Sequence, residues 1–269
     1  MSSVPVPGGE LWADQAGSGP AVVLVHAGIA DHTMWDAQVE PLAAAHTVVR
    51  IDQRGFGRSR WEEQEFRRDD DIRAVLDHLG LDRAVLLGCS LGGAACLDVA
   101  VGTPDRVSGL VWVCGGVSGL EHEGFPEEET AMFERAEALW EAKEFDELVD
   151  LETHIWVDGP LAPDDRAPAP VREHVARMIR EIETREQAQP TALPPEVPAV
   201  DNLDRIDCPV LVLIGGHDTH GTRASADYLS SHLPGAERVD FPDSAHVPNM
   251  EHPERFNEAL LGFLERHGL

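Results

Sequence analysis

Short apolar runs alternate with helix-length segments along most of this chain, and this alternation constrains the fold more than any other feature. The runs have the length of strands and are rich in β-branched residues, which is typical of strands covered on both faces. The segments between them carry apolar residues at spacings of three and four, as amphipathic helices do. The pattern predicts an α/β fold with a parallel sheet. Strands are expected over 21–26, 46–52, 83–88, 109–114, 209–216 and 236–241, with a closing helix over 253–268.

One long region interrupts the alternation. Residues 117–205 contain no convincing strand and hold nine of the nineteen prolines. We interpret this region as an inserted helical cap with helices over 126–149 and 171–187. The segment 158–170 between them is rich in proline and turn-forming residues, which oppose regular structure. The core then comprises residues 1–116 and 206–269.

The charge balance argues against two classes of partner. The chain has 21 Lys and Arg against 49 Asp and Glu, a formal net charge of −28, and such a protein repels nucleic-acid phosphates and anionic membrane surfaces. No apolar stretch reaches the length of a membrane span, and residues 1–10 lack the pattern of a signal peptide. We expect a cytoplasmic protein with a small-molecule partner, either a monomer or a homodimer.

The cysteines give no sign of a metal site or of a disulfide framework. They lie in or beside apolar segments, without the CxxC spacing of metal ligands. Reduced, buried thiols are expected for all four, and no metal or organic cofactor is predicted. The four are Cys89, Cys96, Cys114 and Cys208.

The stretch LLGCSLGGAA, residues 86–95, places two possible nucleophiles side by side, Cys89 and Ser90. A nucleophile on a sharp strand-to-helix turn crowds the positions two before and two after it, so that only very small residues fit there. Gly88 and Gly92 occupy these positions around Ser90, whereas Cys89 would have leucine at both. The glycines therefore select Ser90.

A serine nucleophile needs a base, usually histidine, that is oriented by a carboxylate. On such a turn the chain order is Ser, then Asp or Glu, then His, each in a loop after a strand. Asp218 follows the strand expected over 209–216, and His246 follows the one over 236–241. These loops open at the same edge of the sheet as Ser90.

Other acids and bases are less suitable. His217 and His220 flank Asp218 in its own loop, whereas acid and base need separate loops for the imidazole to lie between carboxylate and hydroxyl. His252 lies near the start of the closing helix and is expected at the surface.

Two other acids are alternatives to Asp218. Asp243, close to His246 in the sequence, suits a turn. Glu121, after the strand over 109–114, is the first alternative acid to test.

The negative charge that develops on a substrate carbonyl oxygen needs backbone N–H donors. One is expected from the residue after the nucleophile, Leu91, and the other from the loop after an early strand. Gly28 is the predicted second donor, with Ile29 as a rival. His26, at the end of that strand, is expected to bond loop backbone.

Five motifs occur in a fixed order along the chain: VHAG (25–28), DQRGFGRS (52–59), GCSLGG (88–93), GGHD (215–218) and SAHVPNMEHPERF (244–256). Together they resemble the α/β-hydrolase superfamily, and within it the 3-oxoadipate enol-lactonase-like enzymes, small esterases and cofactor-free perhydrolases. The resemblance implies a doubly wound, mostly parallel sheet of about eight strands with an inserted helical cap. Ala27 departs from the family, which usually has glycine there. An aspartate at the nucleophile position, as in the family's dehalogenases and epoxide hydrolases, is absent, which favours acyl chemistry.

The predicted function is hydrolysis of a small carboxylic ester or lactone through an acyl-enzyme. A lyase, cyclase or perhydrolase using the same three residues is the first alternative, because a fold does not determine a function. A small-molecule sensor is the second. Apolar residues of the cap and of the loops near Ser90 are expected to contact the substrate, namely Ile29, Trp140, Trp156 and Val247.

Overall fold

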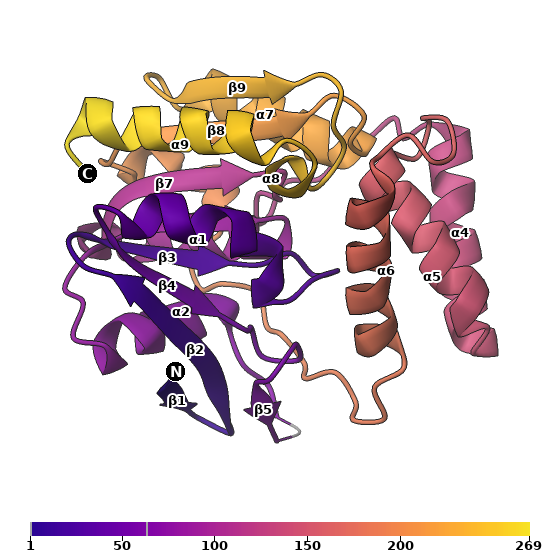
Figure 1. Cartoon of the computed structure of the whole chain (residues 1–269), viewed down its shortest axis with the longest axis horizontal. Helices are drawn as coiled ribbons and strands as arrows, with labels where there is room; N and C mark the ends of the chain where they lie inside the picture. The colour runs from indigo at the N-terminus through magenta and orange to yellow at the C-terminus, as the bar shows by residue number, and fades with distance from the viewer. Residues whose placement is uncertain (1, 63) are drawn as a thin grey trace.

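The computed structural model describes residues 2–62 and 64–269. Within these residues nine strands form one sheet, in the order β1-β2-β4-β3-β6-β7-β8-β9, and β5 pairs with β2 (Figure 1). Their bounds are β1 Ser2–Val6, β2 Gly9–Gly17, β3 Ala21–Val25, β4 Thr47–Ile51, β5 Arg60–Trp61, β6 Ala84–Cys89, β7 Val107–Val113, β8 Val210–Gly215 and β9 Glu237–Phe241.

The sheet is parallel from β4 to β9, and only β1, β2 and β5 pair in antiparallel fashion. The predicted mostly parallel α/β sheet is thus confirmed, and each of the six expected strands is present. The strands β1, β2 and β5 were not predicted from the sequence. They form the sheet's edge, where β2 alternates buried and exposed residues and so lacks the continuous apolar run used as the signal.

Helices cover both faces of the sheet. The core helices α1 and α9 pack against each other, as do α2 and α3, and α7 packs on β8. The structure's α-helices are α1 Asp36–Ala43, α2 Arg68–His78, α3 Leu91–Gly102, α4 Glu127–Ala142, α5 Phe145–Thr153, α6 Ala169–Glu183, α7 His220–His232, α8 Pro248–Glu251 and α9 Pro253–His267. Short helical turns are η1 His32–Trp35, η2 Pro104–Arg106, η3 His154–Asp158 (a π-helical turn), η4 Ala199–Asp201 and η5 Leu203–Arg205.

The central strands form the hydrophobic core. Every residue of β3, β6 and β8 is buried. Each fully buried Val, Leu or Ile side chain stabilises the fold by about 1.5–3 kcal/mol. The strand ends, and the loops that leave them, are therefore held in fixed positions by the interior of the protein.

The region between β7 and β8 forms three helices, and here one boundary prediction is wrong. The helix expected over 126–149 is two helices, α4 and α5. Lys143 separates them in the left-handed conformation, with φ of 59°, and its N–H bonds the carbonyls of Leu139 and Trp140. A left-handed residue ends a helix, and no glycine marks this one in the sequence. The second expected helix, 171–187, corresponds to α6.

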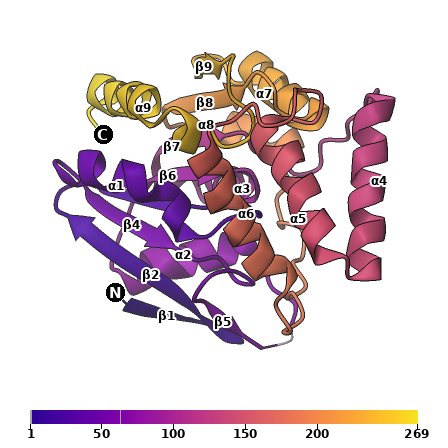
Figure 2. The same ribbon diagram turned by 45° about the vertical axis from the view of Figure 1, so that its right-hand side comes forward.

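The helices α4, α5 and α6, called the cap helices below, stand beyond the carboxyl ends of the parallel strands (Figures 1 and 2). Thr33 in the turn η1 is hydrogen-bonded to His174 of α6, with 2.9 Å between Oγ1 and Nε2. The N–H of Asp31 donates to Met178 Sδ on the same helix at 3.4 Å. We propose that the cap comprises residues 117–205, as the sequence suggested.

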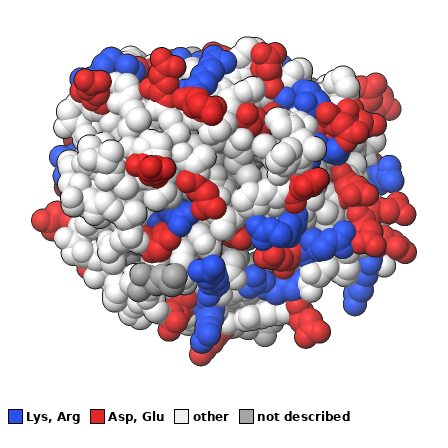
Figure 3. All heavy atoms as spheres, in the orientation of Figure 1, with Lys and Arg blue, Asp and Glu red and all other residues white. Residues whose placement is uncertain are grey.

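Charged side chains gather on the right of the face in Figure 3, the side on which the cap helices lie. Residues of the cap helices form exposed ion pairs, such as Arg177–Glu181 and Arg180–Asp146, which contribute little to stability. Among the described residues, no helix combines the length and apolarity needed to cross a bilayer. All four cysteines are free thiols, and all but Cys208 are buried.

Candidate active site

Ser90 lies on the turn between β6 and α3 in a strained conformation, with φ of 54° and ψ of −117°. Glycine is required on both sides of it. A Cβ atom at Gly88 would lie 2.2 Å from the carbonyl oxygen of Gly92, and one at Gly92 would lie 2.3 Å from that of Val25. The first is the close approach on which the choice of Ser90 depended, and the second shows that β3 also requires glycine at position 92.

Cys89 has the opposite environment. Its side chain is fully buried, and its Sγ donates to the carbonyl oxygen of His246 at 3.5 Å. Burial, and then the nearby charge of Asp218, raises the pKa of the Cys89 thiol well above its usual value. Because the thiolate is the reactive form, Cys89 is suited to packing.

Asp218 and His246 meet at the ends of neighbouring strands. Asp218 follows β8, His246 follows β9, and both side chains are buried. His246 Nδ1 lies 2.9 Å from each carboxylate oxygen of Asp218, so Nδ1–H donates to Asp218 and leaves Nε2 free to accept a proton. The Asp218 carboxylate also accepts the N–H of Thr219 at 2.7 Å.

Ser90 and His246 line one cavity of about 350 Å³. Trp156, from the turn after α5, forms part of the wall, and its ring centre lies 4.6 Å from that of His246. The Trp156 carbonyl accepts the N–H of His246 at 3.1 Å, so the cap helps to position the histidine. The lining residues are Ser90, Leu91, Ala94, Cys114, Gly115, Gly116, His122, Trp156, Thr219, Gly221, Thr222, Ser225 and His246.

The loop after β3 lies against the start of α3. A Cβ atom at Gly28 would be 3.4 Å from Leu91 Cδ2, so the two predicted N–H donors belong to adjoining segments. His26 is buried, with Nδ1 donating to the carbonyl of Ala27 at 2.7 Å and Nε2 accepting the N–H of Gln53 at 2.9 Å. These bonds give His26 the loop-bonding role expected from the sequence.

The alternative acids and bases lie elsewhere. The His220 N–H donates to Glu129, and His252 Nε2 donates to the carbonyl of Asp243 at 3.4 Å. Glu121 is exposed. None of the five alternatives is among the residues that line the Ser90 cavity, namely Glu121, His217, His220, Asp243 and His252.

Three of the four predicted substrate contacts are not found in the cavity wall. Trp140 is 57% exposed on α4, and the cap residue next to His246 is instead Trp156 in the turn after α5. Val247 is fully buried, and Ile29 packs against the hydrophobic core. Trp156 alone of the four lines the cavity.

A partly buried ion pair joins the cap to the loop that carries His246. Arg166 donates to Glu251 at 2.7 Å and to the carbonyl oxygens of Val157, Asp158 and Asp243. The other carboxylate oxygen of Glu251 accepts the Ser244 hydroxyl at 2.6 Å and the Ala245 N–H at 2.9 Å. The two residues preceding His246 are therefore fixed by Glu251. No local pattern in the sequence predicts this pair, because its members are 85 residues apart.

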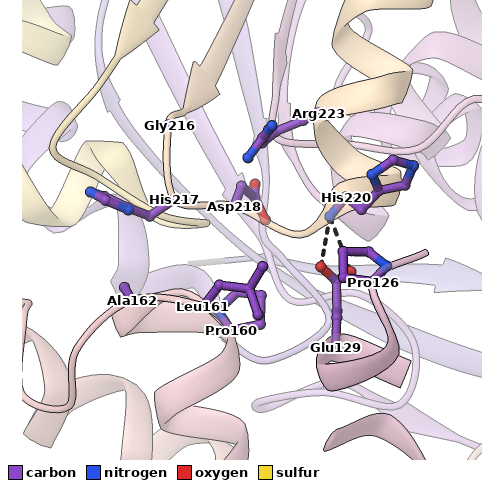
Figure 4. A pocket seen from close by; sticks show the side chains of 10 residues that line it. All are labelled: Pro126, Glu129, Pro160, Leu161, Ala162, Gly216, His217, Asp218, His220 and Arg223. Carbon is purple, nitrogen blue, oxygen red and sulfur yellow. Dashed lines mark hydrogen bonds between the residues drawn. The ribbon is translucent and has the colours of Figure 1, made fainter. Parts of the chain in front are cut away.

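A second, smaller cavity of about 180 Å³ borders Asp218. Figure 4 shows it between the Asp218 loop and residues Pro160 and Leu161 of the cap. Both carboxylate oxygens of Glu129 accept the His220 N–H, at 3.0 and 3.1 Å (Figure 4). The cap thus places a buried carboxylate at the start of α7.

Comparison with known proteins gives a family match over most of the chain. A model of the alpha/beta hydrolase fold family matches residues 20–253. The 3-oxoadipate enol-lactonase 1 of Acinetobacter baylyi is 23% identical over 91% of this chain and 89% of its own length. The pimeloyl-[acyl-carrier protein] methyl ester esterase of Nitrosomonas europaea is 26% identical over 91% and 96%.

Solved structures agree with this match. A crystal structure of a hydrolase from Pseudomonas aeruginosa superposes with a TM-score of 0.78 at 27% identity. The superposition covers 98% of this chain and 97% of the other. The similarity therefore includes the cap helices as well as the core.

Proposed function

This chain belongs to the α/β-hydrolase fold family, and from that premise we propose that it is a serine hydrolase that cleaves a small carboxylic ester or lactone. The proposal rests above all on one observation. Ser90, on a strained turn between two required glycines, shares a cavity with His246, whose Nδ1 is bound to Asp218. The names of the relatives, an esterase and an enol-lactonase, support this reaction class.

In the proposed mechanism, His246 Nε2 takes the Ser90 proton as Oγ attacks the substrate carbonyl carbon. Asp218 holds the imidazole in the required tautomer and stabilises its positive charge. The N–H groups of Gly28 and Leu91 bind the oxyanion. His246 then protonates the leaving alcohol, and the same histidine activates water to release the acid from Ser90. These steps require no metal or organic cofactor.

The test is covalent labelling with a fluorophosphonate probe, followed by assays on a panel of esters and lactones. Wild type and Cys89→Ala should both be labelled, and Ser90→Ala should not. Loss of the nucleophile should reduce turnover by roughly 10⁶-fold. Labelling that persists in Ser90→Ala, or inactivation by a thiol reagent that Cys89→Ala resists, would contradict the assignment.

A further inference from the structure

One wall of the Ser90 cavity is polar. Thr219, Thr222 and Ser225 recur every third residue at the start of α7, and His122 from the loop after β7 joins them. The other lining residues include Leu91, Ala94 and Trp156, whose side chains are mainly apolar. Such an unequal lining suits a substrate with an apolar side and a hydrogen-bonding group on the other.

His122 and Ser225 form a pair in this wall. Ser225 Oγ lies 3.1 Å from His122 Nε2, and Ser225 is buried. The imidazole is held against the first turn of α7, since a Cβ atom at Gly221 would lie 3.5 Å from His122 Cδ2 and 3.4 Å from Phe125 Cε1. The pair therefore has a fixed place in the cavity.

The pair has one proton more than its own hydrogen bond uses. A neutral imidazole carries one N–H and a serine carries one O–H, and a single bond between them uses one of these two. If Ser225 donates to Nε2, the His122 Nδ1–H remains. If Nε2–H donates to Ser225, the serine hydroxyl proton remains. Either arrangement leaves a donor for an oxygen of the substrate.

The surroundings of this wall disfavour an anion. Of the residues that the structure places around the cavity, none is Lys, Arg, Asp or Glu. Behind the wall, the buried Glu129 carboxylate already accepts the N–H at the start of α7. Burial, and then the neighbouring His220, lowers the pKa of His122, which favours its neutral form. A substrate carboxylate would meet no positive side chain here.

We propose that the His122–Ser225 pair, with Thr222 beside it, selects an uncharged ester or lactone that carries a second hydrogen-bonding oxygen, as in a hydroxyl or an amide. This inference rests on the proposed function, because it concerns the part of the substrate that lies away from Ser90. It replaces the broad class of small esters and lactones by the hydroxylated or amide-bearing members of that class.

The test compares four methyl esters of similar size: methyl butyrate, the two enantiomers of methyl 3-hydroxybutyrate, and monomethyl succinate. Acid release is followed by titration at constant pH. For wild type, kcat/KM should be roughly tenfold higher for the better hydroxy enantiomer than for butyrate, the gain of about one hydrogen bond. Monomethyl succinate should be the poorest substrate.

Ser225→Ala and His122→Phe each remove one of the pair's two donors, together with the bond that orients the other donor. Each single variant should therefore lower the hydroxybutyrate-to-butyrate ratio, and the double variant should bring it close to one. Ser230→Ala is the matched control. It lies on the same helix, its hydroxyl bonds the Ala226 carbonyl at 2.7 Å, and it is not a lining residue. Should one pair variant fail to fold by circular dichroism, the other carries the test.

The outcomes separate this inference from the proposed function. If Ser90 is labelled and methyl butyrate is cleaved, but the hydroxy ester is no better or both variants keep the wild-type ratio, the inference is wrong and the proposed function stands. A preference for monomethyl succinate also overturns it. If wild type cleaves no ester or lactone and Ser90 is not labelled, both fail.

Discussion

The core and the cap hold their parts of the site by different means. In the core, Ser90, Asp218 and His246 stand at the ends of strands that are enclosed by a continuous apolar interior. The cap helices pack on one another, and cap residues such as Val175 and Met178 belong to the same apolar cluster. Polar contacts, such as the Arg166–Glu251 pair, join the cap to the loop that carries His246. This difference predicts that changes in the core abolish the reaction, changes at the junction slow it, and changes within the cap alter selectivity or stability.

The largest effect in this comparison is expected in the core. Asp218→Asn should lower kcat by about 10⁴-fold, because an amide can hold the imidazole in the wrong tautomer while preserving its position. Steady-state kinetics on a short ester measure this. Asp243→Asn, in the exposed part of the His246 loop, is the control and should retain activity. Near-normal turnover in Asp218→Asn would identify another carboxylate as the acid, with Glu121 the first to examine.

An intermediate effect is expected at the junction. Arg166→Gln leaves Glu251 buried without its charged partner, which costs about 3–5 kcal/mol of stability. It also loosens the residues before His246, so kcat should fall by about 10- to 100-fold, with a smaller change in KM. Thermal unfolding and steady-state kinetics check both parts.

Two further variants test whether this effect comes from the pair itself. Arg172→Gln is the matched control, since Arg172 pairs with Asp158 and Asp165 of the cap and does not bond the His246 loop. Adding Glu251→Gln to Arg166→Gln should recover part of the lost stability. An Arg166→Gln protein with wild-type kcat would show that the cap does not position the histidine.

A smaller effect concerns the length of the acyl chain. The cavity of about 350 Å³ suits short acyl groups, and chains beyond about eight carbons would have to displace the cap. Across p-nitrophenyl esters from acetate to palmitate, kcat/KM should peak at the short chains. A maximum at the long chains would instead indicate that the cap is a mobile lid, as in lipases.

The smallest effect is expected inside the cap. Burial, and then the nearby Glu183, raises the pKa of Glu152 on α5 to about 8 from an ordinary value of 4.5. Because its pKa is higher in the folded protein, Glu152 binds a proton more tightly there than in the unfolded chain. The stability contributed by this proton is complete below pH 4.5 and is lost as the pH rises to about 8. Glu152→Gln should therefore raise the melting temperature by a few degrees near pH 8, at roughly 2–4 °C per kcal/mol.

At about pH 5 the same substitution should have little effect, because Glu152 is then mostly protonated in the folded protein. Glu173→Gln, on the exposed surface of α6, controls for the loss of one negative charge. An equal rise in melting temperature at both pH values would show that Glu152 does not titrate in this range.

The sequence predicted best those features that depend on neighbours in the chain. Gly88 and Gly92 stand two residues from Ser90, and Asp218 and His246 directly follow apolar runs, so short motifs sufficed to propose all three candidate catalytic residues. The same local reasoning failed at Lys143, where a left-handed turn without glycine divides one expected helix into two.

Other features lay beyond prediction because they depend on distant pairings. The His122–Ser225 pair joins residues 103 apart in the sequence, and no local pattern links them. A signal for part of this wall was nevertheless present. Thr219, Thr222 and Ser225 recur at a spacing of three directly after the predicted acid, so they share one face of a helix that begins at the site.

The contacts of the cap with the His246 loop also bear on protein engineering. Exchanging the cap of one such enzyme for that of another is an obvious way to alter its specificity. Here a chimaera with a foreign cap would lose the Trp156 carbonyl that accepts the His246 N–H, and the Arg166 side chain that neutralises Glu251. A successful graft should therefore retain the segment 154–167 of this chain, or replace Glu251 together with the cap.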